Sequence, residues 1–172
     1  MIRRSLFGLG WVAVAFAIVA ALLAPLPVAA GMPPRAGQLA PAFSLPRAHG
    51  SGLLSLASLR GKAVYLNFFS TWCSPCNDEA PSVVGLYKKY RARGLVTVGV
   101  NEFENGTKAL EFAKKFGIPF PVVVDSDGLM GKDYGVIAMP VHVFIDRKGK
   151  ISTFRLGEMT PGEIEDAIKK IL

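Results

Sequence analysis

This sequence has few cysteines, no acidic residue near its N-terminus and no phosphate-binding loop. Only two cysteines occur among 172 residues, which excludes a scaffold held by several disulfides and a zinc site with four sulfur ligands. Basic residues outnumber acidic ones by 20 to 13, but they are scattered in short pairs that are typical of solvated helix faces. The sequence has no recognition motif for nucleic acid and no glycine-rich loop that would cradle a phosphate. The chemistry of the chain therefore centres on one pair of cysteines.

The first 30 residues are strongly apolar and contain no acidic residue. An uncharged run at Leu6–Ala24 would be about 28 Å long as a helix, just enough to cross the hydrocarbon core of a bilayer. The small residues Val28–Ala30 could be a cleavage site, so residues 1–30 are either a signal peptide or an uncleaved signal anchor. The length of the run favours the anchor. Arg3 and Arg4 predict a cytoplasmic N-terminus, and both interpretations export the rest of the chain.

Residues 31–37 are rich in proline and glycine, which predicts an extended or flexible linker. The remaining residues, 38–172, are long enough for one domain. An exported domain can keep a disulfide, because bacterial compartments outside the cytoplasmic membrane are oxidising.

Apolar runs and turn residues predict alternating strands and helices in this domain. A short edge strand near 53–56 precedes an almost wholly apolar run at 63–69, which is typical of a strand buried on both faces. A helix from about Cys73 to Arg93 should be kinked at Pro81. The further expected elements are a strand at 95–100, a helix at 107–116, a strand at 121–124, a short helix at 129–134, a hairpin of strands at 141–146 and 151–155, and a helix after a capping box at 160–163. The order predicts a βαβ half with parallel strands, followed by a ββα half.

The cysteine pair, Cys73 and Cys76, follows the buried strand and opens a helix. A helix N-terminus favours a thiolate, so Cys73 is the predicted nucleophile. Cys76 lies one helical turn deeper and could resolve a mixed disulfide formed at Cys73 without any cofactor. Haem attachment would need histidine where Asn77 stands. A zinc site that uses the distant histidines and a pair of inert thiols are the alternatives.

The region from about residue 39 to the end resembles the TlpA and ResA-like (CcmG/DsbE-type) branch of the thioredoxin superfamily. The residues that carry the resemblance are Ala40–Leu45, Leu59–Lys62, Leu66–Cys76, Glu79, Pro81, Phe120–Asp125 and Met139–Pro140. It implies an α/β thioredoxin-like fold, in which helices flank a central mixed sheet of four or five strands. It also implies an N-terminal extension and an inserted strand-helix unit at 96–117.

Further site residues follow only from this resemblance. Members of the family face their cysteines with a cis-proline loop, which matches Met139 and Pro140. With Trp72, these two residues are expected to contact substrate, and the cis bond would expose the backbone of Met139 for strand-like pairing. His142 stands where threonine is frequent, and we expect a structural role for it.

A proton acceptor for the cysteines must also be found. Asn67 occupies the position of the buried acid of cytoplasmic thioredoxins, and an amide cannot accept a proton at neutral pH. The resemblance places a glutamate in the insert, which is Glu104 here with Glu102 as a neighbouring candidate. A carboxylate buried beside a thiol could shuttle the proton of Cys76.

These features predict a thiol-disulfide oxidoreductase that reduces disulfides of exported proteins. The resemblance suggests apocytochrome c as a substrate and a membrane thiol electron donor. A disulfide-forming oxidase and a copper-handling protein that uses both cysteines and His142 are the alternatives. A peroxidase is disfavoured, because Leu66 stands where its motif needs proline.

No cofactor, resident metal or nucleic-acid partner is expected. The catalytic domain is expected on the periplasmic side of the cell inner membrane, tethered there, or free in the periplasm if the leader is cleaved.

Overall fold

The structure, a computed structural model, describes residues 33–172. The predicted signal peptide or anchor, residues 1–30, and the first part of the linker lie outside these residues. Among the helices of the described part, none is long and apolar enough to cross a membrane.

A five-stranded sheet forms the centre of the domain, in the order β5-β4-β3-β6-β7. Strand β3 pairs in parallel with β4 and antiparallel with β6, while β5 is parallel to β4 and β7 antiparallel to β6. The sheet is therefore mixed, and β3 is its central strand. The strands are β3 (Ala63–Phe69), β4 (Leu95–Glu102), β5 (Val122–Asp125), β6 (Val141–Ile145) and β7 (Ile151–Leu156).

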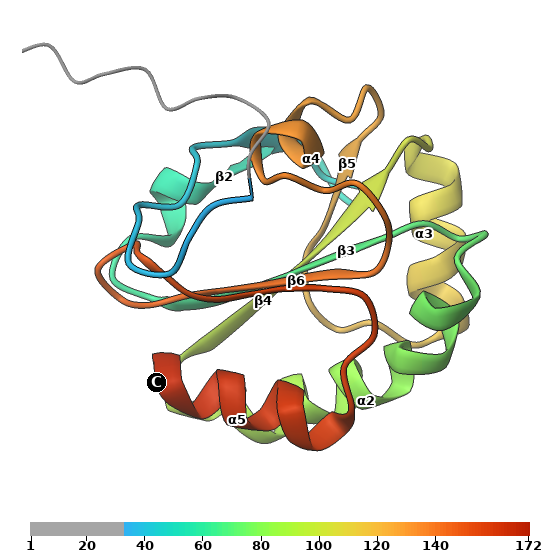
Figure 1. The fold of residues 1–172 in the computed structure, drawn as a ribbon. Helices are drawn as coiled ribbons and strands as arrows, with labels where there is room; N and C mark the ends of the chain where they lie inside the picture. Colours follow the sequence, from blue (N-terminus) through green and yellow to red (C-terminus); the bar gives the residue numbers. More distant parts are fainter. Residues whose placement is uncertain (1–32) are drawn as a thin grey trace, which may run out of the picture.

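Helices cover both faces of this sheet. Figure 1 shows α2 and α5 on one face and α4 on the other. Helix α3 packs on the face of α2, through Ala109 and Phe112. The four helices are α2 (Ser74–Tyr90), α3 (Gly106–Lys115), α4 (Leu129–Asp133) and α5 (Pro161–Ile171). Short 3₁₀ turns, η1 (Leu56–Leu59) and η2 (Arg91–Arg93), precede β3 and β4.

Alternate residues of the strands point to the two faces of the sheet and fill the cores there. Val64, Leu66 and Phe68 of β3 point to the face under α4. Ala63 and Tyr65 point to the face under α2 and α5, where the apolar side of α5 packs. Because both faces are covered, the run at 63–69 is apolar on both sides, as the sequence predicted.

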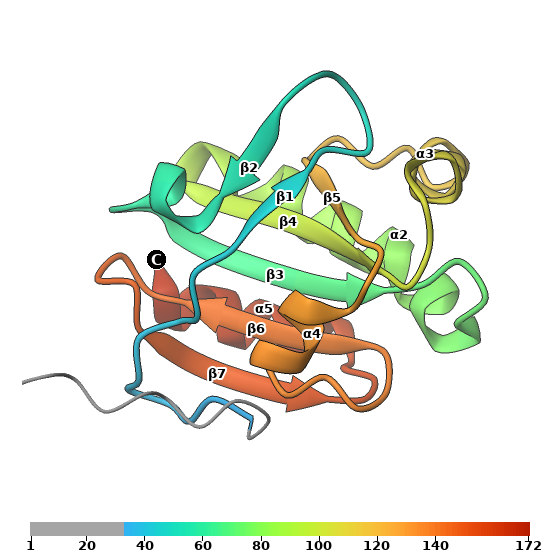
Figure 2. The same cartoon turned by 90° about the horizontal axis from the view of Figure 1, so that it is seen from above.

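The N-terminal extension crosses the sheet from one edge to the other (Figure 2). Leu39 forms a bridge with Lys150 just before β7, and Arg47 forms a bridge with Val123 of β5. Between these bridges the chain forms β1 (Ser44–Pro46), which belongs to a small hairpin. Both outer strands of the sheet therefore gain a backbone partner from the extension.

Most predicted elements are confirmed, including the parallel first half, the final hairpin, the inserted strand-helix unit and the capping box. The expected edge strand near residue 53 needs correction. Strand β2 (Leu53–Ser55) pairs with β1 in a separate two-stranded sheet rather than at the edge of the main one. The structure also assigns one continuous helix through Pro81.

Candidate functional site

The two cysteines lie at the start of α2, directly after the central strand. They form a disulfide with an S–S distance of 2.00 Å and a Cα–Cα distance of 5.3 Å. Cys73 is the N-cap of α2, and its sulfur accepts a hydrogen bond from the backbone N–H of Cys76 at 3.2 Å. This N–H and the helix dipole would stabilise a thiolate at Cys73 after reduction. The geometry therefore fits Cys73 as the nucleophile and Cys76 as the resolving cysteine.

A proline loop lies against the segment that leads to the cysteines. The bond between Met139 and Pro140 is cis, as the resemblance implied. The Ser70 hydroxyl lies 3.2 Å from the sulfur of Met139 and donates a hydrogen bond of 2.8 Å to the backbone oxygen of Glu102. Ser70 thus joins the loop before β6, the end of β3 and the end of β4 at one point. Trp72 lies beside Cys73 and is 67% exposed.

The carboxylate of Glu104 is bound to the loop before Cys73. It accepts hydrogen bonds from the backbone N–H of Thr71 at 2.7 Å and from the Thr71 hydroxyl. The side-chain amide of Asn101 donates a third bond, at 2.8 Å. Glu104 therefore fixes the position of Thr71, two residues before Cys73.

Glu102 points to the opposite face of the sheet and lies apart from Glu104. Its side chain is fully buried, as is that of Asp125, and the two residues are paired in register on the neighbouring strands β4 and β5. Burial, reinforced by the interaction with Asp125, raises the pKa of Glu102 to about 9. Glu102 is therefore a neutral acid near pH 7, and it packs against Gly131 of α4.

A buried polar cluster, which the sequence pattern did not reveal, lies on the α2 side of the sheet. Glu79 lies one helical turn after Cys76, and its Oε2 is 3.3 Å from Nε2 of His142. The other carboxylate oxygen accepts a hydrogen bond from the backbone N–H of Met159. Nδ1 of His142 lies 2.8 Å from the hydroxyl of Tyr65. These contacts connect the helix of the cysteines to the strand that follows the proline loop.

The charge state of this cluster follows from its contacts. Burial and the negative charge of Glu79 raise the pKa of Tyr65 well above its usual value, so Tyr65 keeps its proton. If the Tyr65 hydroxyl donates to Nδ1 of His142, the ring proton sits on Nε2 and faces Glu79. His142 then serves as the partner of a buried carboxylate, in line with its expected structural role. The signals in the sequence were a histidine within an apolar strand and the place of Glu79 among the residues that carry the family resemblance.

These contacts do not favour the copper-handling alternative. His142 lies between Tyr65 and Glu79, so its ring nitrogens face those two groups rather than an open ligand position. Within residues 33–172, no group of three or more histidine, cysteine, aspartate or glutamate side chains converges on a metal position.

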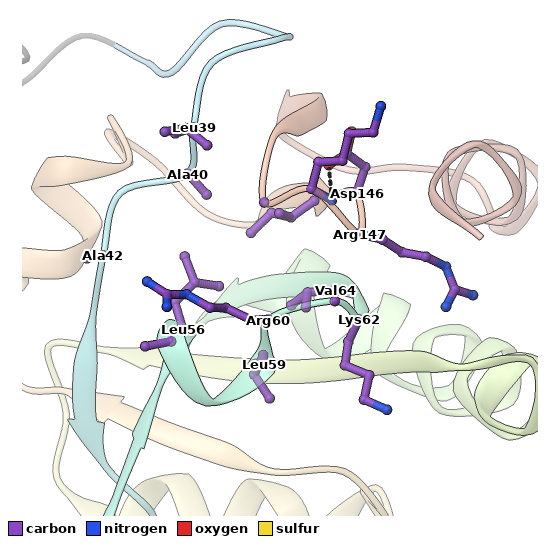
Figure 3. Close-up of a pocket in the computed structure, with 15 residues that line it drawn as sticks. Leu39, Ala40, Ala42, Leu56, Leu59, Arg60, Lys62, Val64, Asp146 and Arg147 are labelled. Atoms are coloured by element: carbon purple, nitrogen blue, oxygen red, sulfur yellow. Dashed lines mark hydrogen bonds between the residues drawn. The ribbon is translucent and has the colours of Figure 1, made fainter.

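A hollow of about 410 Å³ lies at the other end of the sheet from the cysteines (Figure 3). Its walls include Val64 at the start of β3 and Ile145 at the end of β6, whereas the cysteines follow the end of β3. The hollow is therefore separate from the redox site.

A model of the AhpC/TSA family matches residues 36–154. The chain belongs to the AhpC/TSA family. The thiol-disulfide oxidoreductases ResA of Bacillus thuringiensis subsp. konkukian and of Bacillus subtilis are each 36% identical to it over 135 residues. These matches cover 78% of this chain, and 78% and 75% of the two relatives.

Solved structures agree with this family. A Chlorobium tepidum protein assigned as the thiol:disulfide interchange protein DsbE has a TM-score of 0.74 at 31% identity, covering 80% of this chain and 98% of its own. A secreted Mycobacterium tuberculosis disulfide oxidoreductase homologous to E. coli DsbE has a TM-score of 0.67 at 27% identity, covering 74% and 95%. With the paired cysteines in place, these relatives show that this AhpC/TSA-family protein is a thioredoxin-fold thiol-disulfide oxidoreductase.

Proposed function

We propose that this oxidoreductase reduces disulfides of exported proteins, with apocytochrome c as the candidate substrate. In the reaction, the Cys73 thiolate attacks one sulfur of the substrate disulfide and the other substrate sulfur leaves as a thiolate. Cys76 loses its proton and attacks the Cys73 sulfur, which releases the second substrate thiolate and closes the internal disulfide. Two electrons pass from the protein dithiol to the substrate. A membrane dithiol donor returns them for the next cycle.

The observation that carries this proposal is the Cys73–Cys76 disulfide at the start of α2, opposite the cis-proline loop.

The midpoint potential of the cysteine pair tests the direction. The pair would be equilibrated against thiol redox buffers at pH 7. A value at or below about −250 mV, near that of thioredoxin, supports the reductase. A value close to about −120 mV, as in the strong oxidant DsbA, would instead make the protein a disulfide-forming oxidase.

We further propose that residues 1–30 anchor the protein to the cell inner membrane, with the domain on the periplasmic side. The uncharged run at Leu6–Ala24 and the basic residues before it support this arrangement. Fractionation of the full chain, with protease added outside the membrane, tests it. If residues 1–30 are an anchor, the domain is found in the membrane fraction and is digested by the added protease. If the leader is cleaved, the domain is found in the soluble fraction.

We propose that Glu104 assists proton transfer from Cys76 and also fixes the loop before Cys73. The three hydrogen bonds to its carboxylate support the second part directly. Glu104→Gln is expected to slow disulfide reduction, while Glu111→Gln on the exposed face of α3 serves as the control. Equal rates for Glu104→Gln and the unchanged protein would exclude the part in proton transfer, because the amide oxygen of glutamine can still accept a hydrogen bond from Thr71.

A further inference from the structure

Basic side chains gather around the hollow at the end of the sheet opposite the cysteines. Arg60 and Lys62 come from the turn between η1 and β3, and Arg147 and Lys148 come from the turn between β6 and β7 (Figure 3). Lys150 lies at the end of the second turn, just before β7. Arg60, Lys62, Lys148 and Lys150 are all exposed. We call these four residues the basic face.

Little negative charge offsets the basic face. None of the ion pairs within residues 33–172 involves its four side chains. Asp146 is the one acidic residue among those that line the hollow. Its Oδ1 accepts hydrogen bonds from the backbone N–H groups of Lys148 and Lys150, at 2.8 and 2.9 Å. The face therefore presents a net positive charge to any surface that lies against it.

The chain enters the domain beside this face. The backbone N–H of Gly37 donates a hydrogen bond of 2.7 Å to the oxygen of Ile151, the first residue of β7. Pro34 is buried beside the same strand, and Leu39 lines the hollow itself. From Ala24, the end of the apolar run, to Pro34 the chain spans at most about 35 Å even when fully extended. This is about the width of a domain of this size, so an anchor at residues 1–30 keeps the β7 side and the adjoining basic face close to the membrane.

An exposed apolar side chain lies among these charges. Leu39 is 70% exposed, and it forms a bridge with Lys150 of the basic face. Leu56 and Leu59, which are half-buried, line the same hollow. Apolar side chains flanked by basic ones suit the interface of a lipid bilayer, because the apolar part enters the headgroup region while the charged ends approach the lipid phosphates.

We propose that the basic face docks on an anionic lipid surface, that of the membrane that holds the anchor. This inference rests on the proposed anchor at residues 1–30 and adds the part of the domain that meets the lipids. The field of an anionic membrane falls off within about 8 Å at physiological salt. Only a face that is held close to the membrane gains from it, and the short tether holds this one close.

Docking sets the direction in which the cysteines face. Strand β3 has seven residues and spans about 23 Å, with the basic face at its start and Cys73 after its end. A docked domain therefore holds the cysteines away from the membrane, where exported proteins can reach them. Recharging by a membrane donor requires the domain to leave the surface and turn, which a salt-sensitive contact permits.

Lysine labelling of the full chain in vesicles tests the proposal. The chain is reconstituted in vesicles of phosphatidylcholine, alone or with about one third phosphatidylglycerol. It is labelled briefly with acetic anhydride, a neutral reagent that charged vesicles do not repel, and mass spectrometry gives the rate for each lysine. Lys62 and Lys150 report on the basic face. Lys108 in α3 and Lys132 in α4 are exposed controls, because these helices follow β4 and β5 at the cysteine end.

In vesicles that contain phosphatidylglycerol, Lys62 and Lys150 should be labelled about threefold more slowly than in phosphatidylcholine alone. High salt should remove the difference, because it screens the attraction. Lys108 and Lys132 should be labelled at the same rate in both kinds of vesicle.

Two double variants separate the basic face from net charge. Arg60→Gln with Lys148→Gln removes two charges of the face, and the protection of Lys62 should largely disappear. Lys108→Gln with Lys132→Gln removes the same charge at the cysteine end, and the protection of Lys62 should remain.

Equal labelling of Lys62 and Lys150 in both kinds of vesicle would overturn the proposal, as would equal protection of Lys62 in both double variants. Flotation of the vesicles distinguishes this failure from that of the anchor. A chain that floats with the vesicles but shows no protection has an anchor without docking. A chain that floats with neither kind of vesicle refutes the anchor and the docking together.

Discussion

Glu102→Gln is expected to stabilise the protein, and the gain should grow with pH. The folded state keeps the Glu102 proton up to a pKa of about 9, compared with 4.5 for an ordinary glutamate. Above pH 4.5 the unfolded chain releases this proton, so the free energy of unfolding falls as pH rises and levels off above pH 9. Glutamine does not titrate, and its amide can donate to Asp125 in place of the carboxyl proton.

The size of the effect follows from the shift in pKa. At pH 7 the unfolded chain has passed its own pKa by 2.5 units, which costs the folded state about 3 kcal/mol at 1.36 kcal/mol per unit. At pH 5 the cost is only about 1 kcal/mol. The difference in stability between variant and unchanged protein should therefore grow by about 2 to 3 kcal/mol between pH 5 and pH 7.

Guanidinium unfolding followed by tryptophan fluorescence at pH 5, 6, 7 and 8 measures this difference. Glu158→Gln, which replaces an exposed glutamate, is the control and should show no such trend. Parallel pH curves for Glu102→Gln and the unchanged protein would refute the reasoning, since they would mean that Glu102 releases its proton at the same pH in both states.

Two further substitutions test contacts in the two cores. Gly131→Ala would place a Cβ atom 2.3 Å from Oε2 of Glu102, and should lower the free energy of unfolding by about 1 to 3 kcal/mol. Gly85 has open space around it, so Gly85→Ala is the control and should cause no such loss. An equal effect of both variants in thermal unfolding would contradict the expected clash with Glu102. His142→Leu leaves Glu79 without its side-chain partner and should lower the free energy of unfolding by about 3 kcal/mol. His142→Gln retains a donor and should lower it clearly less. Equal losses of stability in chemical unfolding would show that the pairing with Glu79 is not what stabilises this site.

Local patterns in the sequence were sufficient for the central features of the fold. The apolar run at 63–69 and the cysteines that follow it predicted a buried strand that leads into a helix, and the structure confirms both. The resemblance added the cis bond before Pro140, because nothing in a single X-Pro pair distinguishes cis from trans.

Contacts between distant residues could not be predicted in the same way. Strand β2 was expected at the edge of the main sheet, but its partner is the three-residue strand β1, which is too short to show a pattern. Tyr65 and His142 are 77 positions apart, and only the pairing of β3 with β6 brings them together. Glu79 joins them from a helix, so three separate elements had to be placed before the cluster could be seen.

The path of the N-terminal extension has a consequence for how the protein avoids association with other chains. The outer strands of an open sheet present unpaired backbone groups that can recruit strands from other molecules. Here one segment, residues 37–48, occupies part of both edges, through Ile151 on one side and Val122 on the other. A chain that begins after residue 40 would therefore expose the β7 edge alone, whereas a chain that begins after residue 48 would expose both edges to strands of other molecules.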